Sequence, residues 1–187
     1  MISVLRLLPL LSLTPIFGAA GSLQESAWVV YLRSAGPVQI GMPVAEVRSR
    51  IGDSDAYLVQ APRQRRELPH EPDDSPCAYM VSARIPEQIG LMFERGNLVR
   101  IDVYDQGIRT ASGAQVGDTE SRILDVYPGK IDVRQHHYPP AGAHYMIFTP
   151  VDRIDRDVRM LFETDGTYVT RYRTGLAEAV AYVEGCA

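Results

Sequence analysis

Three histidines are the residues of this sequence best suited to metal chemistry. His136, His137 and His144 lie close together in the chain, and imidazole is the commonest metal ligand in proteins. In an extended strand, His136 and His137 point to opposite faces, so only one of them can share a site with His144. A zinc site needs three or four convergent ligands, and the sequence has no His-Glu-x-x-His pattern. We therefore expect no metal and no cofactor. A small exported metal-binding protein or hydrolase, built on the His136 and His144 strands, is the alternative function.

The acidic residues suggest two further groupings. Glu94 and Glu163 each follow a phenylalanine, and paired carboxylates can act as general acid and base. The two residues occupy equivalent positions in two similar segments of the sequence, 91–99 and 160–169, and this similarity explains the pair without a catalytic role. Asp152, Asp155 and Asp157 alternate with arginines, but a calcium loop needs a different spacing and a glycine at its sixth position. Because the sequence also lacks a Gly-x-Ser-x-Gly elbow and a phosphate-binding glycine loop, we expect no catalytic residue and a non-enzymatic protein.

Aromatic residues and one arginine are better candidates for a binding site. Tyrosine and arginine are enriched among the residues that anchor protein interfaces. Tyr104, Tyr168 and Tyr172 fall on predicted strands, and Arg100 shares a strand face with Tyr104. We expect these four side chains to face away from the helices and to bind another protein. The alternative is an ordinary solvated sheet surface, and a register shift of one residue would reverse every facing.

The two cysteines, Cys77 and Cys186, are expected to form a disulfide. The bond would hold the segment that ends the sequence against its first half. A reactive Cys77 beside a histidine is the alternative, but an oxidising compartment and a single possible partner favour the bridge.

The first 20 residues have the features of a secretory signal peptide. Arg6 precedes an apolar run from Leu7 to Phe17, and Gly18 and Ala20 suit cleavage by signal peptidase. We therefore expect a periplasmic or secreted protein. The apolar run is too short for an ordinary membrane span, so no membrane insertion is expected after cleavage. The formal net charge of −4 argues against a nucleic-acid partner.

The order of motifs in the first half of the chain is repeated in the second half. Residues 38–47 are similar to residues 114–123, and residues 91–99 are similar to residues 160–169. Two copies are too few for a solenoid, so we expect a tandem duplication packed as one body. After the signal peptide over 1–20, the first repeat is expected over 21–110 and the second over 111–187.

Each repeat is predicted to contain one helix, a loop and an antiparallel sheet, which is an α+β fold. An amphipathic helix buries its apolar stripe on a sheet, so both helices should cover one sheet face and leave the other free. The polar, proline-rich residues 53–76 are expected to be a solvated loop, with partner binding as the alternative. Leu176, Val180 and Val183 have helical spacing. The expected helices cover 44–51 and about 119–126, and the expected strands cover 77–83, 89–94, 98–104, 131–138, 144–149, 159–163 and 167–173.

The first repeat opens with Ile40-Gly41-Met42, Val47 and Ile51-Gly52, followed by a strand with Phe93-x-x-Gly96-x-Leu98. This pattern resembles the SmpA/OmlA family of bacterial envelope proteins. The tandem form resembles the fold of the beta-lactamase inhibitory protein. These resemblances imply a role in binding other proteins through a concave sheet. The sequence departs from the family at Asp118, which replaces the usual methionine, and it has no lipobox cysteine.

Overall fold

The computed structural model describes residues 28–60, 69–137 and 141–186. The predicted signal peptide and residues 61–68 of the predicted loop lie outside the described residues. Within the described ranges, the protein has a mixed α/β structure in which one large antiparallel sheet is accompanied by a few short helices. None of the helices in these ranges is long and apolar enough to cross a membrane.

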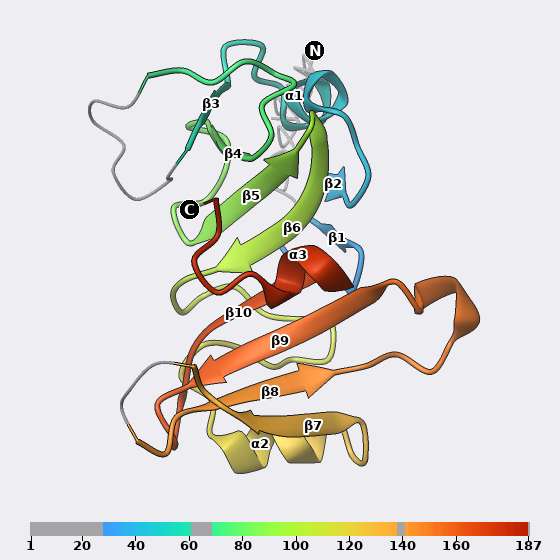
Figure 1. The fold of residues 1–187 in the computed structure, drawn as a ribbon, viewed down its shortest axis with the longest axis vertical. Coiled ribbons are helices and arrows are strands. Elements are labelled where there is room, and N and C mark those ends of the chain that lie inside the picture. The colour runs from blue at the N-terminus through green and yellow to red at the C-terminus, as the bar shows by residue number, and fades with distance from the viewer. Residues whose placement is uncertain (1–27, 61–68, 138–140, 187) are drawn as a thin grey trace, which may run out of the picture.

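A single eight-stranded antiparallel sheet organises the fold (Figure 1). Strands that follow one another in the chain are neighbours within each half, and β6 and β10 join the two halves. At this central pairing, Arg173 lies opposite Asp102 and Gly175 lies opposite Arg100. From one edge to the other, the strands are β3 (Tyr57–Val59), β4 (Ala78–Val81), β5 (Ile89–Glu94), β6 (Asn97–Val103), β10 (Val169–Leu176), β9 (Val158–Thr164), β8 (His144–Phe148) and β7 (Ile131–Gln135).

The two predicted helices are confirmed, and each precedes four strands of the sheet. Helix α1 (Val44–Ile51) ends at Gly52, whose positive φ of 70° lets its N–H turn back to helix carbonyls. Helix α2 (Glu120–Val126) begins after Thr119, whose hydroxyl accepts a hydrogen bond from the Arg122 N–H at 3.2 Å. These local stop and start signals explain why the helix boundaries could be predicted from the sequence.

The larger part of the core lies between the sheet and helices α1 and α2. Val47 from α1 and Ile123 from α2 are fully buried with Phe93, Phe162 and Tyr172. Burying one side chain of this size contributes about 1.5–3 kcal/mol. This layer therefore supplies most of the hydrophobic stabilisation of the fold.

The opposite sheet face, which we call the α3 face, is not free as predicted. Helix α3 (Ala177–Ala181) and the residues that follow it lie across the middle of this face (Figure 1). Ala179 packs with Tyr79, Met92 and Val99, and Val180 packs with Leu161 and Tyr145. The predicted Cys77–Cys186 disulfide is confirmed, and it ties this segment, residues 177–186, to the strand region beside β4.

The facing predicted for Tyr172 is wrong. Its side chain is 1% exposed and lies in the core beneath α1 and α2. The pairing of β10 with β9 is irregular between Val169 and Arg171, and such a bulge changes which side chains share a face. As a result, Val169 and Tyr172 both face the core, although they are three residues apart.

Four short elements lie outside the predicted helices and strands. Strand β3 lies within the predicted loop 53–76, where its three residues are too few for a visible alternation. Strands β1 (Ser34–Ala35) and β2 (Val38–Gln39) pair on either side of Gly36 and Pro37. A 3-10 turn (Arg153–Asp155) lies between β8 and β9, and its acidic residue Asp155 pairs with Arg33 at 2.6 Å. Asp155, one of the aspartates that alternate with arginines, thus anchors the connection between β8 and β9.

Gly175 is required where β10 passes close to β6. A Cβ atom added at this position would lie 2.2 Å from the Val99 carbonyl oxygen. We expect Gly175→Ala to lower the free energy of unfolding by about 2 kcal/mol, because two paired backbones must move apart. Gly107→Ala is the control, since Gly107 also has a positive φ but has open space around it. Urea unfolding should show the larger loss for Gly175→Ala, and equal losses would contradict the steric explanation.

Candidate functional site

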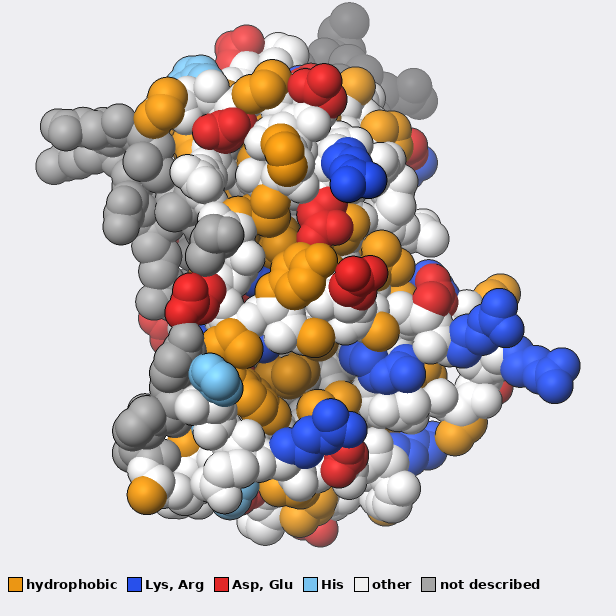
Figure 2. All heavy atoms as spheres, viewed as in Figure 1, with side chains coloured by type: hydrophobic (Ala, Val, Ile, Leu, Met, Phe, Trp, Pro, Cys, Tyr) orange, Lys and Arg blue, Asp and Glu red, His pale blue; other side chains and the backbone are white. Residues whose placement is uncertain are grey.

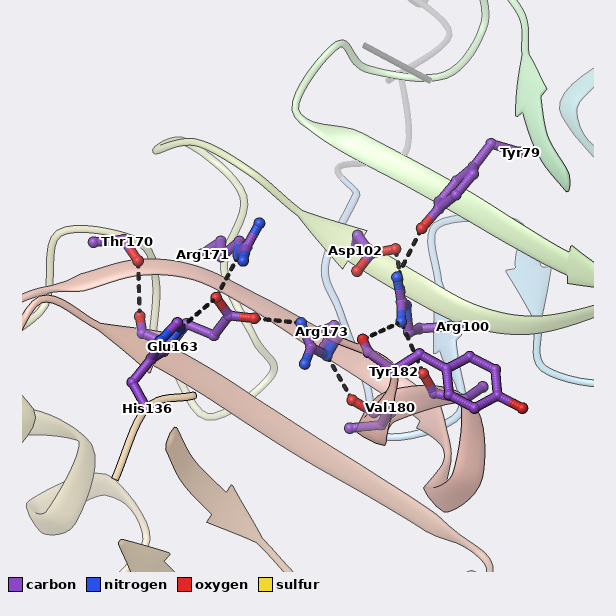
Figure 3. Close-up of polar contacts among 11 residues, drawn as sticks. Tyr79, Arg100, Asp102, His136, Glu163, Thr170, Arg171, Arg173, Val180 and Tyr182 are labelled. Atoms are coloured by element: carbon purple, nitrogen blue, oxygen red, sulfur yellow. Dashed lines mark hydrogen bonds and ion pairs between the residues drawn. The ribbon is translucent and has the colours of Figure 1, made fainter. Parts of the chain in front are cut away.

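Two arginines from the central strands hold the segment 177–186 on the α3 face. Arg100 on β6 and Arg173 on β10 are both about 4% exposed. Each donates to backbone carbonyls of that segment, as Figure 3 shows. The strand pairing places the two side chains on the same face, because Arg100 lies opposite Gly175 and Arg173 lies opposite Asp102.

Arg100 donates four hydrogen bonds to partners within the protein. Its Nη1 donates to the carbonyls of Ala179 at 2.8 Å and Tyr182 at 3.1 Å. Its Nε donates to Asp102 at 3.1 Å, and its Nη2 donates to the Tyr79 hydroxyl at 2.7 Å. Burial, the largest cause, raises the pKa of Tyr79 to about 12, so its hydroxyl is neutral at physiological pH. Arg100 is therefore a structural cation that joins β4, β6 and α3.

Glu163 on β9 is the centre of a second group of charges. Its carboxylate accepts hydrogen bonds from Arg173, from Arg171 Nε at 2.5 Å and from His136 Nε2 at 3.3 Å. Burial alone would raise the pKa of Glu163, but the charges of Arg173 and Arg171 outweigh it and hold that pKa below its ordinary value. Arg173 also donates through Nε to the Val180 carbonyl at 2.7 Å, so the carboxylate positions the arginine that holds α3.

We call these side chains together the arginine network. Figure 3 shows two groups of contacts, one around Arg100 and one around Glu163 and Arg173, which are joined through the backbone carbonyls of the segment 177–186. A buried charge that loses its partner is strongly destabilising, whereas a satisfied network rigidifies its surroundings. The network therefore fixes the position of α3 on the sheet. It consists of Tyr79, Arg100, Asp102, His136, Glu163, Arg171 and Arg173.

Two hollows lie on the α3 face, and the first of them is lined in part by the segment 177–186. The first, of about 1080 Å³, lies among β5, β6 and the end of that segment, and its lining includes Glu94, Val99 and Glu178. The second, of about 320 Å³, lies beside Glu163 and Arg171. Figure 2 shows hydrophobic side chains along the middle of this face, with acidic side chains beside them above and most of the basic ones below. The face thus offers two openings of different character.

The structure separates the four binding residues predicted from the sequence. Arg100 and Tyr172 are buried, at 3% and 1% exposure. Tyr104 is partly exposed and its ring covers Gly90 of β5, where an added Cβ would lie 2.6 Å from the Tyr104 hydroxyl. Tyr168 is 50% exposed but pairs with Thr119 at the start of α2, away from the arginine network.

The histidines and carboxylates predicted as alternatives do not converge. His136 contacts Glu163 on the α3 face, whereas His144 Nδ1 lies 2.8 Å from Glu120 of α2, beneath the other face. Glu94 lines the first hollow and Glu163 lines the second. In the part of the chain that the structure describes, no group of three His, Cys, Asp or Glu residues is placed to hold a metal ion.

The functional residues that sequence reasoning missed are the partners of Arg100 and Glu163. Arg171 and Arg173 alternate along one strand, and this alternation of arginines signals a charged strand face. What the sequence does not reveal is that β10 pairs with β6 and β9, which places Arg173 between Asp102 and Glu163.

Comparisons with known proteins assign no family to this chain. No protein-family model and no curated protein matches the sequence. Among solved structures, the crystal structure of the uncharacterized protein yfeY from Escherichia coli is similar, with a TM-score of 0.44 and 13% sequence identity. The similarity covers 79% of this chain and 99% of that chain. We assign no function from it.

Proposed function

We propose that this chain is an exported, non-enzymatic protein-binding module that holds its partner on the α3 face. The observation that supports this most is the arginine network, which immobilises α3 across the sheet and leaves two hollows on this face. A surface that is already ordered loses little conformational entropy when it binds, and this preorganisation favours affinity. The periplasmic or extracellular location is part of the same proposal.

We also propose that the two halves are tandem repeats that resemble the SmpA/OmlA family. Equivalent hydrogen bonds support this. The Gly41 N–H donates to the Leu98 carbonyl at 2.7 Å, and the Gly117 N–H donates to the Val169 carbonyl at 2.8 Å. Both glycines have φ near 90° and precede a helix. Such a duplication would produce a broad two-part sheet, the kind of surface with which the beta-lactamase inhibitory protein engages an enzyme. Fold alone does not decide function, so the binding role needs its own test.

Of the four residues predicted to bind, two can touch a partner directly. Tyr104 lies at the edge of the α3 face and Tyr168 is exposed elsewhere, so both remain proposed contacts. Arg100 and Tyr172 are too buried to be reached, and we propose that Arg100 contributes by holding α3 in place.

The proposal predicts that bulk added to α3 blocks the partner. Ala181 is the exposed last residue of α3, so Ala181→Trp should obstruct the α3 face without entering the core. Leu124→Trp is the control, because Leu124 is 45% exposed on α2, on the other side of the sheet. Each immobilised variant is incubated with envelope and culture-supernatant proteins, and the retained proteins are quantified by mass spectrometry.

We expect one protein to be retained in stoichiometric amount by the wild type and by Leu124→Trp. Its retention by Ala181→Trp should fall at least roughly tenfold, the effect of losing a central contact. If retention is unchanged by Ala181→Trp, or is lost only with Leu124→Trp, the interface does not lie on the α3 face. If the wild type retains no protein, the binding proposal itself is overturned.

A further inference from the structure

The first hollow on the α3 face has an apolar floor. It lies where the segment 177–186 curves away from β5 and β6, and its floor includes Val99, Leu176, Tyr182 and the Cys77–Cys186 disulfide. Its volume of about 1080 Å³ is slightly above the range of small-molecule sites, roughly 300–1,000 Å³. A groove of this size, open to solvent along the sheet, can accept a short length of another polypeptide chain.

The rim of this hollow is acidic. Three carboxylates, Glu94, Glu178 and Glu184, line it, against one guanidinium, that of Arg95. Glu94 ends β5 and Glu178 lies in the first turn of α3, so the two acids come from opposite walls. The charge of Glu94 is the largest of the causes that raise the pKa of Tyr182. A negative field therefore extends over the apolar floor.

We propose that this hollow binds a basic and apolar segment of the partner protein, in which a branched aliphatic side chain is flanked by lysine or arginine. The apolar side chain would fill the floor, and the flanking cations would meet Glu94 and Glu178. This assignment rests on the proposed function, which it makes more specific. It follows from charge complementarity, since like charges facing one another at an interface reject the wrong partners.

Synthetic peptides test the assignment without knowledge of the partner. The probe is a fluorescein-labelled, capped peptide, Gly-Lys-Leu-Leu-Lys-Gly, followed by fluorescence anisotropy at low ionic strength. Two matched peptides accompany it, Gly-Glu-Leu-Leu-Glu-Gly with reversed charge and Gly-Lys-Ser-Ser-Lys-Gly without apolar side chains. The proteins are the wild type, Glu94→Gln, Glu178→Gln, the double variant and Glu87→Gln. Glu87 is exposed outside the hollow and serves as the control.

We expect the lysine–leucine peptide to bind, and the two matched peptides to bind at least roughly tenfold more weakly. Each single Glu→Gln change should weaken binding roughly two- to fivefold, as for other partly exposed ion pairs, and the double change roughly tenfold. Glu87→Gln should have no effect, and added salt should weaken binding because the charges are partly exposed. Thermal unfolding of every variant should match the wild type, since the substituted side chains are solvent-accessible.

Four outcomes would overturn the assignment. Equal binding of the serine peptide would show a response to net charge alone, and equal binding of the glutamate peptide would show no charge preference. An effect of Glu87→Gln as large as that of Glu94→Gln would place the peptide elsewhere. If the peptide fails while Ala181→Trp still abolishes capture of a natural partner, the assignment fails and the proposed function stands. If peptide binding succeeds but Ala181→Trp has no effect on capture, the proposed function fails instead.

Discussion

Replacing both cysteines with serine should lower the free energy of unfolding by about 4 kcal/mol. The Cys77–Cys186 bond joins residues 109 positions apart. In the chain-entropy model, a loop of this length restricts the unfolded chain by about 4–5 kcal/mol. Urea unfolding of the Cys77→Ser/Cys186→Ser variant, followed by circular dichroism, measures the difference. For a domain of this size, the midpoint of thermal unfolding should fall by about 10 °C.

Amide hydrogen exchange shows which part of the protein is destabilised when the disulfide is removed. Without the disulfide, the segment 177–186 is held by the hydrogen bonds of Arg100 and Arg173 and by the packing of Ala179 and Val180. Amide hydrogen exchange should therefore accelerate in this segment before the rest of the sheet. Reductant added to the wild type should reproduce both effects, and it should change nothing in the double serine variant. A loss below about 1 kcal/mol, with unchanged exchange, would show that the arginine network alone holds the segment.

Local signals explain which parts of this fold could be predicted. The stripe of Val44, Val47 and Ile51 and the terminal Gly52 predict α1, which is where the structure has it. The strands β5 and β6 were expected within one residue of their observed bounds, because alternation and the hairpin at Gly96 lie within the same short stretch. The disulfide followed from the presence of only two cysteines.

Long-range contacts explain what could not be predicted. Which side chains of β10 face the core depends on the irregular pairing between Val169 and Arg171. No residue type in that stretch indicates this irregularity. It moved Tyr172 into the core and left Arg171 and Arg173 on the α3 face. Likewise, the helical spacing after Gly175 predicted a helix but not the sheet face that it covers. The face that α3 covers depends on Arg100 of β6 and Arg173 of β10, which donate hydrogen bonds to backbone carbonyls of α3.

Removing the carboxylate of Glu163 should destabilise the protein by about 3–5 kcal/mol. Glu163 is 2% exposed and accepts hydrogen bonds from Arg171, Arg173 and His136. Glu163→Ala would leave the buried Arg173 without its opposing charge, and an unpaired buried charge carries a penalty of this size. Because Arg173 also donates to Val180, the position of α3 should loosen at the same time. Urea unfolding at pH 7 measures the loss of stability.

An exposed ion pair provides the matched control for Glu163. Asp132 contacts Arg134 at 2.7 Å, and both side chains are more than half exposed. Asp132→Ala should therefore change the free energy of unfolding by at most about 1 kcal/mol. Losses of similar size for the two variants would contradict the view that burial makes the Glu163 contacts strong.

The pH dependence of a Glu163→Gln variant isolates the charge of this residue. The pKa of Glu163 is lower in the folded protein than its ordinary value of 4.5, so the folded state binds the proton less readily than the unfolded chain. The stabilisation is therefore fully present above pH 4.5 and is lost as the pH falls through the folded-state pKa. Below that pH, protonated Glu163 resembles glutamine, and the difference in stability between wild type and Glu163→Gln should narrow. A constant difference from pH 7 down to acid unfolding would show that Glu163 acts through its shape and hydrogen bonds rather than through its charge.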